Sequence, residues 1–238
     1  MKMNTRNYLI IGGSSGNGLA ISRRLAEKNH QVYIGSRTAG NIPAMENIHH
    51  LRFDVLSDEI SEKELPDSLD GLVYCPGTIN LRPLKQLRVE DFLADFKINV
   101  LGAVKTIQSV LDLMRKGPDG ASVVLFSTVA VQTGMAYHAS VASAKDSVEG
   151  LTRSLAAEFA PQIRVNCIAP SLTDTPLAAQ LLSTEAKQKA ASDRHPLKRV
   201  GRPEDIASLA CFLLSGESDW ITGQILHVDG GMSSVRLF

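Results

Sequence analysis

The first residues that could do chemistry form a glycine-rich segment near the start of the chain. An apolar run, Leu9-Ile10-Ile11, is followed directly by Gly12, Gly13, Ser14, Ser15, Gly16, Asn17 and Gly18. This order predicts a buried strand, a tight turn and a helix whose free N–H groups face the gap. Such a helix start attracts a pyrophosphate, and the glycines at 12, 16 and 18 permit the turn, the approach of the phosphates and close helix packing. A plain strand-to-helix connection is the alternative reading.

A hydroxyl and a guanidinium follow the second predicted strand. Residues 31–35 form this strand, and Ser36 and Arg37 stand at its carboxyl end, where a dinucleotide fold meets the adenosine ribose. An acidic residue there would bind the ribose hydroxyls of NAD, whereas an arginine suits a 2′-phosphate. The pair predicts a preference for NADP(H) over NAD(H), with a solvated surface arginine as the alternative.

The elements that must position these residues alternate along the chain. Further strands are expected at 50–55, 71–75, 122–127, 163–169 and 225–228, and striped helices at 19–28, 89–115 and 141–159. This alternation predicts an α/β fold, a doubly wound seven-stranded parallel sheet of Rossmann type. With 238 residues, no internal repeat and no linker, the chain is expected to form a single domain, 1–238.

Composition excludes several classes of partner. The chain has 25 Lys and Arg against 25 Asp and Glu, so it carries no net charge that would favour nucleic acid or an anionic membrane. Cys75, Cys167 and Cys211 lie far apart in apolar runs, without the spacing of disulfides or of metal ligands. No apolar run has the length of a signal peptide or a membrane span, so we expect a cytoplasmic protein that binds no membrane and no metal.

Motifs along nearly the whole chain resemble those of the short-chain dehydrogenase/reductase family. The Gly-x-x-x-Gly-x-Gly spacing begins the resemblance, and it continues at 163–170 (IRVNCIAP), 173–176 (TDTP), 202–205 (RPED) and 220–231 (WITGQ to DGG). The resemblance implies a nicotinamide cofactor and a carbonyl or alcohol substrate of small size. It also implies a homo-oligomer, a tetramer or a dimer, and the long apolar stripes of the helices at 89–115 and 141–159 would offer the surface.

The same resemblance implies the remaining cofactor contacts. Asp54 and Val55 match an adenine-contacting pair, although an Asp that closes a strand is equally often a turn residue. In the family the fourth strand ends in Asn-Asn-Ala-Gly, and of these residues this chain has only the glycine, Gly77. After the sixth strand, the expected contacts are Pro170, Ser171, Thr173 and Thr175.

Hydride transfer to a carbonyl leaves negative charge on oxygen, so a proton donor must lie beside that oxygen. In the family a Tyr donates this proton, a Lys four residues later lowers the pKa of the Tyr and holds the nicotinamide ribose, a Ser orients the substrate, and an Asn supports a proton relay. Lys145 matches the Lys and Asn99 the Asn. Thr128 stands at the Ser position, with Ser127 beside it.

The position of the family's Tyr is occupied by Val141, which has no titratable proton. Valine continues an apolar stripe here, so packing explains it fully. Tyr137 and His138, just ahead of the predicted helix, are the candidate proton donors, or else a surface aromatic and a surface imidazole. Two functions therefore stay open. One is an NADP(H)-dependent oxidoreductase with an atypical acid catalyst, and the other is a catalytically silent NADP(H)-binding protein with a sensing or scaffold role.

Overall fold

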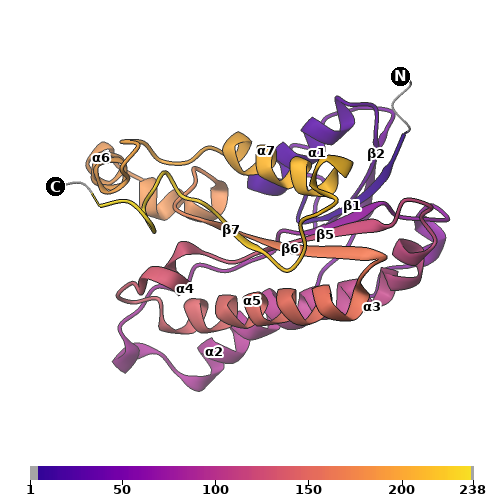
Figure 1. The fold of residues 1–238 in the computed structure, drawn as a ribbon. Coiled ribbons are helices and arrows are strands. Elements are labelled where there is room, and N and C mark those ends of the chain that lie inside the picture. The colour runs from indigo at the N-terminus through magenta and orange to yellow at the C-terminus, as the bar shows by residue number, and fades with distance from the viewer. Residues whose placement is uncertain (1–4, 237–238) are drawn as a thin grey trace.

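Seven parallel strands, in the order β3-β2-β1-β4-β5-β6-β7, form the centre of the computed structural model (Figure 1). The structure describes residues 5–236. The strands are β1 (Asn7–Ile11), β2 (Gln31–Ser36), β3 (Ile48–Arg52), β4 (Gly71–Tyr74), β5 (Ala121–Phe126), β6 (Ile163–Pro170) and β7 (Ile225–Val228). The predicted doubly wound, seven-stranded Rossmann-type fold is confirmed. The strand order changes direction between β1 and β4, and such sheets bind ligands at that point.

Helices cover both faces of this sheet. Figure 1 shows α1 (Gly16–Ala26) and α7 (Pro203–Leu214) on one face, and α2 (Val89–Phe96), α3 (Gly102–Arg115) and α5 (Ala139–Phe159) on the other. The other helical elements are α4 (Val129–Thr133), α6 (Glu185–Arg194), η1 (Glu62–Glu64), η2 (Leu84–Gln86), η4 (Pro176–Leu182) and η5 (Gly216–Ser218). Among the described helices, none has the length and apolar character needed to cross a membrane.

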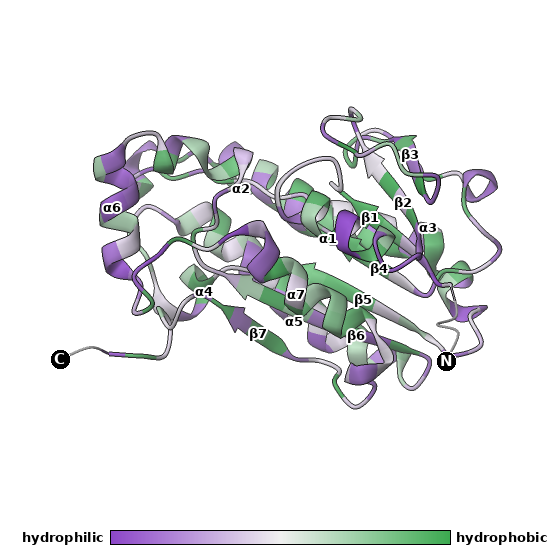
Figure 2. Cartoon of the chain, turned by 90° about the horizontal axis from the view of Figure 1, so that it is seen from above, coloured by the Kyte–Doolittle hydropathy of each residue, from purple (hydrophilic) through white to green (hydrophobic). Residues whose placement is uncertain are grey.

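Alternate residues of each central strand supply two hydrophobic cores. In β1, Leu9 and Ile11 pack with residues of α3 and α5, whereas Tyr8 and Ile10 pack with residues of α1 and α7. A strand buried on both faces reads as a continuous apolar run, which is why β1 and β5 are visible in the sequence. Figure 2 shows more hydrophobic colour in the central strands than in α6, which is largely hydrophilic.

Strand β3 lies earlier in the chain than the predicted strand at 50–55. It pairs with β2 in a register that joins Val32 to Ile48 and Ser36 to Arg52, so it ends where β2 ends. The prediction followed the apolar residues Phe53 and Val55, which lie beyond this ladder. The adenine-contact candidates Asp54 and Val55 therefore lie in a turn after the strand.

The predicted helix at 89–115 forms, but it contains a π-helical turn, η3 (Lys97–Leu101), between α2 and α3. At this turn the Ile98 carbonyl oxygen accepts a hydrogen bond of 2.6 Å from the Tyr74 hydroxyl. Gly102 makes room for that ring, because a Cβ there would lie 3.2 Å from Tyr74 Cζ. Single π turns inside helices occur frequently at functional sites, and this one carries Asn99.

Helix α7 was not predicted from the sequence, although its first residues were noted as a motif. Pro203 stands at its start, where a missing N–H costs nothing. The Asp205 carboxylate accepts a hydrogen bond of 2.7 Å from the backbone N–H of Arg202, which fixes the first turn. The structure therefore adds one covering helix to the predicted set.

The packing of α1 against the glycine loop leads to a stability prediction. A Cβ on Gly18 would overlap the Gly12 carbonyl oxygen and lie 3.0 Å from Gly13 Cα. Both neighbours are backbone atoms, which cannot move aside without distorting the glycine loop. We expect Gly18→Ala to lower the free energy of unfolding in urea by about 1–3 kcal/mol. Gly150→Ala is the matched control, because Gly150 lies in α5 with nothing within 4 Å of the added Cβ. Helix propensity should make that variant more stable by roughly 0.5–1 kcal/mol. Equal effects of the two substitutions would contradict the close packing.

Candidate active site

Strand β1 ends and helix α1 begins at the glycine loop (residues 12–18). Gly12 and Gly16 have φ angles of +77° and +51°, in the left-handed region that favours glycine. The N-cap residue Ser15 makes no side-chain hydrogen bond to the helix. The first N–H groups of α1 are therefore available to an external acceptor, and the helix dipole favours an anion there.

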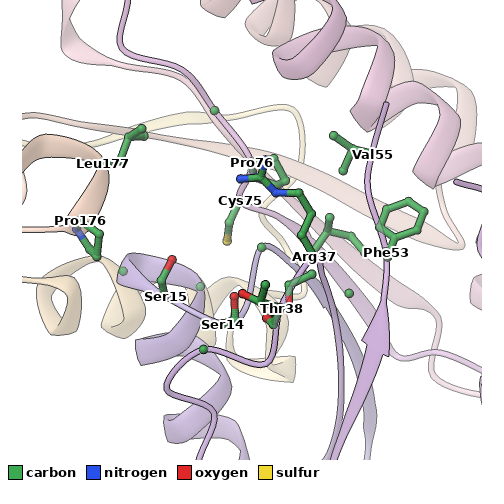
Figure 3. Close-up of a pocket in the computed structure, with 18 of the residues that line it drawn as sticks. Ser14, Ser15, Arg37, Thr38, Phe53, Val55, Cys75, Pro76, Pro176 and Leu177 are labelled. Carbon is green, nitrogen blue, oxygen red and sulfur yellow. Dashed lines mark hydrogen bonds between the residues drawn. The ribbon is translucent and has the colours of Figure 1, made fainter. Parts of the chain in front are cut away.

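The glycine loop lines a cavity of about 450 Å³ at the carboxyl edge of the sheet, here called the glycine-loop cavity (Figure 3). It is bounded by the ends of β1, β2 and β4, the turn after β3 and the start of η4. The predicted cofactor residues that line it are Gly12, Ser14, Ser15, Gly16, Asn17, Gly18, Ser36, Arg37, Asp54, Val55, Gly77 and Thr175. Predicted residues from five separate parts of the sequence are thus brought together.

The glycine-loop cavity fits a dinucleotide. The side chains of Ser14, Ser15 and Thr38 lie along one part of it, and the long Arg37 side chain extends across it (Figure 3). Asn17 Oδ1 is buried without a hydrogen-bond partner among residues 5–236. This oxygen can therefore accept a hydrogen bond from a ligand beside the loop. An uncapped helix start and close-packed glycines match the pyrophosphate of a dinucleotide, and Arg37 adds a cationic side chain at the far end.

Two of the predicted adenosine contacts are already engaged within the protein. Ser36 Oγ donates to the Thr38 carbonyl oxygen at 2.9 Å and lies 3.0 Å from His50 Nε2. Asp54 Oδ1 accepts a hydrogen bond of 3.0 Å from the Leu56 N–H, so this carboxylate shapes the turn while it lines the cavity. Of the two charged side chains that line the glycine-loop cavity, Arg37 is the one available to bind a ligand.

Lys145 reaches the carboxyl edge of the sheet from α5. Its Nζ donates a hydrogen bond of 2.8 Å to the Phe126 carbonyl oxygen at the end of β5, and the residue is 7 % exposed. Burial lowers the pKa of Lys145 to about 8. An ammonium has three donors, and Phe126 is the one hydrogen-bond partner of Nζ among the described residues. The remaining N–H groups are available to hydroxyls of a bound ligand.

Gly77 brings Asn99 and Lys145 to the same place. A Cβ built on Gly77 would lie 3.3 Å from Asn99 Oδ1 and 3.4 Å from Lys145 Nζ. Asn99 Nδ2 donates to the Asp95 carbonyl oxygen at 2.7 Å and to Thr78 Oγ1 at 2.9 Å. Asn99 Oδ1 is buried and has no partner within the described part of the chain. Asn99 thus stands behind Gly77, with one acceptor unused.

A second cavity, of about 320 Å³, adjoins the first and is here called the Lys145 cavity. The two cavities share Asn17, Cys75, Gly77, Thr175 and Leu177 as lining residues. Of the predicted residues, the Lys145 cavity is lined by Asn17, Gly77, Thr128, His138, Lys145, Pro170, Ser171, Thr173 and Thr175, and Val141 lines it as well. Its size suits a small molecule.

The candidate substrate-orienting residues occupy the wall of this cavity in different ways. Thr128 caps α4, where its Oγ1 accepts a hydrogen bond of 3.3 Å from the Ala130 N–H. That contact leaves the hydroxyl hydrogen of Thr128 free to face the cavity. Ser127 Oγ instead donates to Glu149 Oε1 at 2.6 Å. The geometry therefore favours Thr128 over its neighbour as a substrate contact.

The two candidate proton donors, Tyr137 and His138, differ in their position relative to the Lys145 cavity. Val141 is 5 % exposed and packs in the wall of the Lys145 cavity. Tyr137 is 59 % exposed and is not one of the lining residues of either cavity. His138 does line the Lys145 cavity, and its Nδ1 lies 2.8 Å from the Ala136 carbonyl oxygen. Of the two candidates, His138 is the one that borders the space where a substrate would lie.

Comparison with known proteins identifies the family of this site. The sequence profile described as "Enoyl-(Acyl carrier protein) reductase" matches residues 13–233. The chain belongs to the short-chain dehydrogenase/reductase family. It is 36% identical to carbonyl reductase family member 4 of Danio rerio over 96% of this chain and 98% of the relative. It is 32% identical to the 3-oxoacyl-[acyl-carrier-protein] reductase FabG of Aquifex aeolicus, over 98% and 99% of the two chains.

A solved structure shows the same architecture. A gluconate 5-dehydrogenase from Burkholderia cenocepacia, in complex with NADP and tartrate, superposes with a TM-score of 0.87 at 26% identity. The match covers 98% of this chain and 97% of that one. The protein is therefore an oxidoreductase, and its family relates it to enzymes that interconvert carbonyls and alcohols.

Several lining residues were not predicted from the sequence. Thr38 and Phe53 line the glycine-loop cavity, and Cys75 lines both cavities. Burial raises the pKa of the Cys75 thiol to about 12, so this side chain stays protonated at neutral pH. His195 also lines the Lys145 cavity, and no motif marks it, because it reaches the site only through the fold after α6.

The lowered pKa of Lys145 makes stability depend on pH. The folded protein loses this proton near pH 8, whereas the unfolded chain keeps it to about pH 10.5, so stability rises with pH between these values. We expect the free energy of unfolding of the wild type, minus that of Lys145→Met, to increase by about 1 kcal/mol from about pH 7 to 9. Urea unfolding of both proteins measures this difference. A difference that stays constant, or that falls, would show that Lys145 is not desolvated.

Proposed function

We propose that this protein is an NADP(H)-dependent oxidoreductase that interconverts a carbonyl and an alcohol on a small metabolite, with a proton donor other than residue 141. The observation that carries the proposal is the convergence of Lys145 and Asn99 on Gly77, where the glycine-loop cavity meets the Lys145 cavity. A bound nicotinamide would supply a hydride at this junction. The larger cavity would hold the rest of the cofactor, and the smaller one the substrate.

The chain's own residues would divide the remaining work. The N–H groups at the start of α1 would bind the pyrophosphate, and the free N–H groups of Lys145 would bind the nicotinamide ribose. Thr128 would orient the substrate oxygen through its free hydroxyl hydrogen. Asn99 would support proton transfer from behind Gly77 through its unused Oδ1. Burial of these groups strengthens their electrostatic effect on charge that develops at the substrate oxygen.

The preference for NADP(H) would come from Arg37. A guanidinium can bind a phosphate with two parallel hydrogen bonds, and no acidic side chain except Asp54, which is engaged by Leu56, lines the glycine-loop cavity. The NADP complex of the Burkholderia structure shows that a chain of this fold takes that cofactor. Thr38 would add a hydroxyl next to the same phosphate.

Arg37→Ala tests this preference. We expect the variant to bind NADPH more weakly by about 1–3 kcal/mol, with NADH binding nearly unchanged, because only NADPH carries the 2′-phosphate. Fluorescence titration with each cofactor measures both affinities. Arg52→Ala is the matched control, since Arg52 pairs with Ser36 in the next strand but does not line this cavity. Equal affinity of the wild type for the two cofactors would refute the preference.

We also propose that the chain forms a homo-oligomer, a tetramer or a dimer. Helix α2 and the π turn present a row of exposed apolar side chains, with Val89 70 %, Leu93 52 %, Phe96 37 % and Leu101 48 % exposed. Of the predicted stripe, Phe96 belongs to this exposed row, Val100, Ala103, Ile107 and Met114 are buried in the core, and Phe92 and Leu111 are partly buried. An exposed apolar row of this length favours a partner surface over solvent.

Val141 supports a second candidate, a silent NADP(H)-binding protein with a sensing or scaffold role. A positioned acid contributes about 10²–10⁴-fold to the rate, and valine supplies none of this. Turnover separates the two functions. We expect protein-dependent oxidation of NADPH with at least one member of a panel of aldehydes, ketones and quinones, and its loss in Lys145→Ala. Tight binding of NADPH without turnover on the whole panel would favour the silent binder.

A further inference from the structure

Ser171 and His195 form a hydrogen-bonded pair in the wall of the Lys145 cavity. Ser171 follows β6 and His195 follows α6, and Ser171 Oγ lies 2.8 Å from His195 Nε2. The other ring nitrogen, Nδ1, lies 2.7 Å from the Ala191 carbonyl oxygen. His195 is 2 % exposed, so the imidazole is held by these two contacts inside the protein.

The Ala191 carbonyl decides which ring nitrogen carries hydrogen. A carbonyl oxygen only accepts, so Nδ1 is the donor to it. In the neutral ring, Nε2 then accepts from the Ser171 hydroxyl. In the protonated ring, Nε2–H donates to Ser171 Oγ and frees the hydroxyl hydrogen for another acceptor. Met232 Sδ, 3.2 Å from Ser171 Oγ, is a weak acceptor, so a substrate oxygen would be preferred.

The pair borders two separate spaces. Ser171 and His195 line the Lys145 cavity together with Lys145, Thr128 and Val141. Both also line a third cavity, of about 280 Å³, whose other lining residues include Asp205 and Asp229. His195 can therefore pass a proton toward the substrate space on one side and regain one through the third cavity on the other.

Charged and titratable groups line both cavities that the pair borders. In the Lys145 cavity these groups are the cations Lys145 and Arg194 and the imidazole of His138. In the third cavity they are Arg199, Asp205 and Asp229. Among residues 5–236, no carboxylate lines the Lys145 cavity.

Both carboxylates of the third cavity already have partners. Arg199 Nη2 donates to Asp205 Oδ1 at 2.9 Å. Asp229 accepts from the N–H groups of Gly231 and Ser233, each at 2.8 Å. No carboxylate in the described structure is hydrogen-bonded to the His195 ring, so none fixes it as an imidazolium.

We propose that Ser171 and His195 form a proton relay that supplies the proton which Val141 cannot; this inference rests on the proposed function. When a hydride reaches the carbonyl carbon, the electron pair of the C=O π bond moves to oxygen. A bond forms between this oxygen and the Ser171 hydroxyl hydrogen as the Oγ–H bond breaks. A new Oγ–H bond forms as the Nε2–H bond of protonated His195 breaks. Neutral His195 then takes a proton from water, and alcohol oxidation reverses each step.

Ser171→Ala and His195→Gln test the relay. Ser171→Ala removes the hydroxyl, and His195→Gln removes the imidazole. The glutamine amide can still form a hydrogen bond, but it cannot take up and release a proton as an imidazole does. We expect kcat for carbonyl reduction to fall about 10²-fold in both, while both variants remain folded. The double variant should be no slower than either single one, because both act in one path. His227→Gln is the matched control, an exposed histidine of β7 that lines none of the three cavities.

The pH profile separates proton transfer from a structural role. In the wild type, kcat for reduction should fall when His195 loses its proton, because only protonated His195 can supply one. This fall should disappear in both variants, while a decline near pH 8 from Lys145 remains. A readout without turnover is the NMR signal of His195 Cε1–H. The pH dependence of this signal should differ from the wild type in Ser171→Ala and not in His227→Gln.

Each contrary outcome has a distinct meaning. Unchanged kcat and pH profile in both variants would overturn the relay and leave the oxidoreductase standing. A loss seen only in Tyr137→Phe or His138→Ala would assign the proton to those residues and overturn the relay as well. A His195 signal that does not change with pH would overturn the relay too. Absence of any turnover by the wild type, with NADPH bound, would contradict the proposed function and the relay together.

Discussion

The buried ammonium of Lys145 is the group on which the arrangement of the site depends. Moving an ammonium out of water costs several kcal/mol, and here one backbone carbonyl, that of Phe126, offsets part of this cost. The surroundings are built around it. Gly77 has no side chain that would fill the space between Lys145 and Asn99, and β5 ends where its last carbonyl can accept from Nζ. A packed core gains nothing from such a group, so its presence points to a ligand that completes its hydrogen bonds.

The protein illustrates how binding and proton transfer can be separated in one site. The glycine loop, Arg37 and Lys145 form a continuous binding surface along the carboxyl edge of the sheet. Val141 occupies one position in the wall of the Lys145 cavity and is buried in α5. Because the loop after β6 and the end of α6 meet in the same cavity, another pair of side chains is available at the reacting end. In the proposed mechanism, this pair supplies the proton that Val141 cannot.

Much of the fold is visible in the sequence, because burial on both sides gives the central strands an unbroken apolar pattern. β7 was predicted at its observed limits, and β1, β2, β4, β5 and β6 nearly so. The predicted position of β3 was displaced, because pairing with β2 sets the register of this strand and its own apolar residues do not. The π turn at Asn99 also escaped prediction, since Tyr74 and Gly102 determine it from another strand and from the helix itself.

The site was predictable where a motif encodes a local structure and not where a distant contact makes it. The glycine loop and Arg37 follow strands directly, so their place at the sheet edge could be inferred. Ser171 and His195 meet only because the chain after α6 returns to the end of β6, and no spacing in the sequence records this. The engagement of Ser36 by His50 and Thr38 likewise depends on the pairing of β2 with β3.

A crystal structure of the protein with NADP(H) would show whether the two cavities form one site for hydride transfer. We expect the pyrophosphate on the glycine loop, the 2′-phosphate beside Arg37 and the nicotinamide ribose within hydrogen-bond distance of Lys145 Nζ. The nicotinamide ring should then face the Lys145 cavity between Thr128 and Ser171. A dinucleotide bound with its nicotinamide directed away from Lys145, or a nucleotide bound in the glycine-loop cavity alone, would contradict the account.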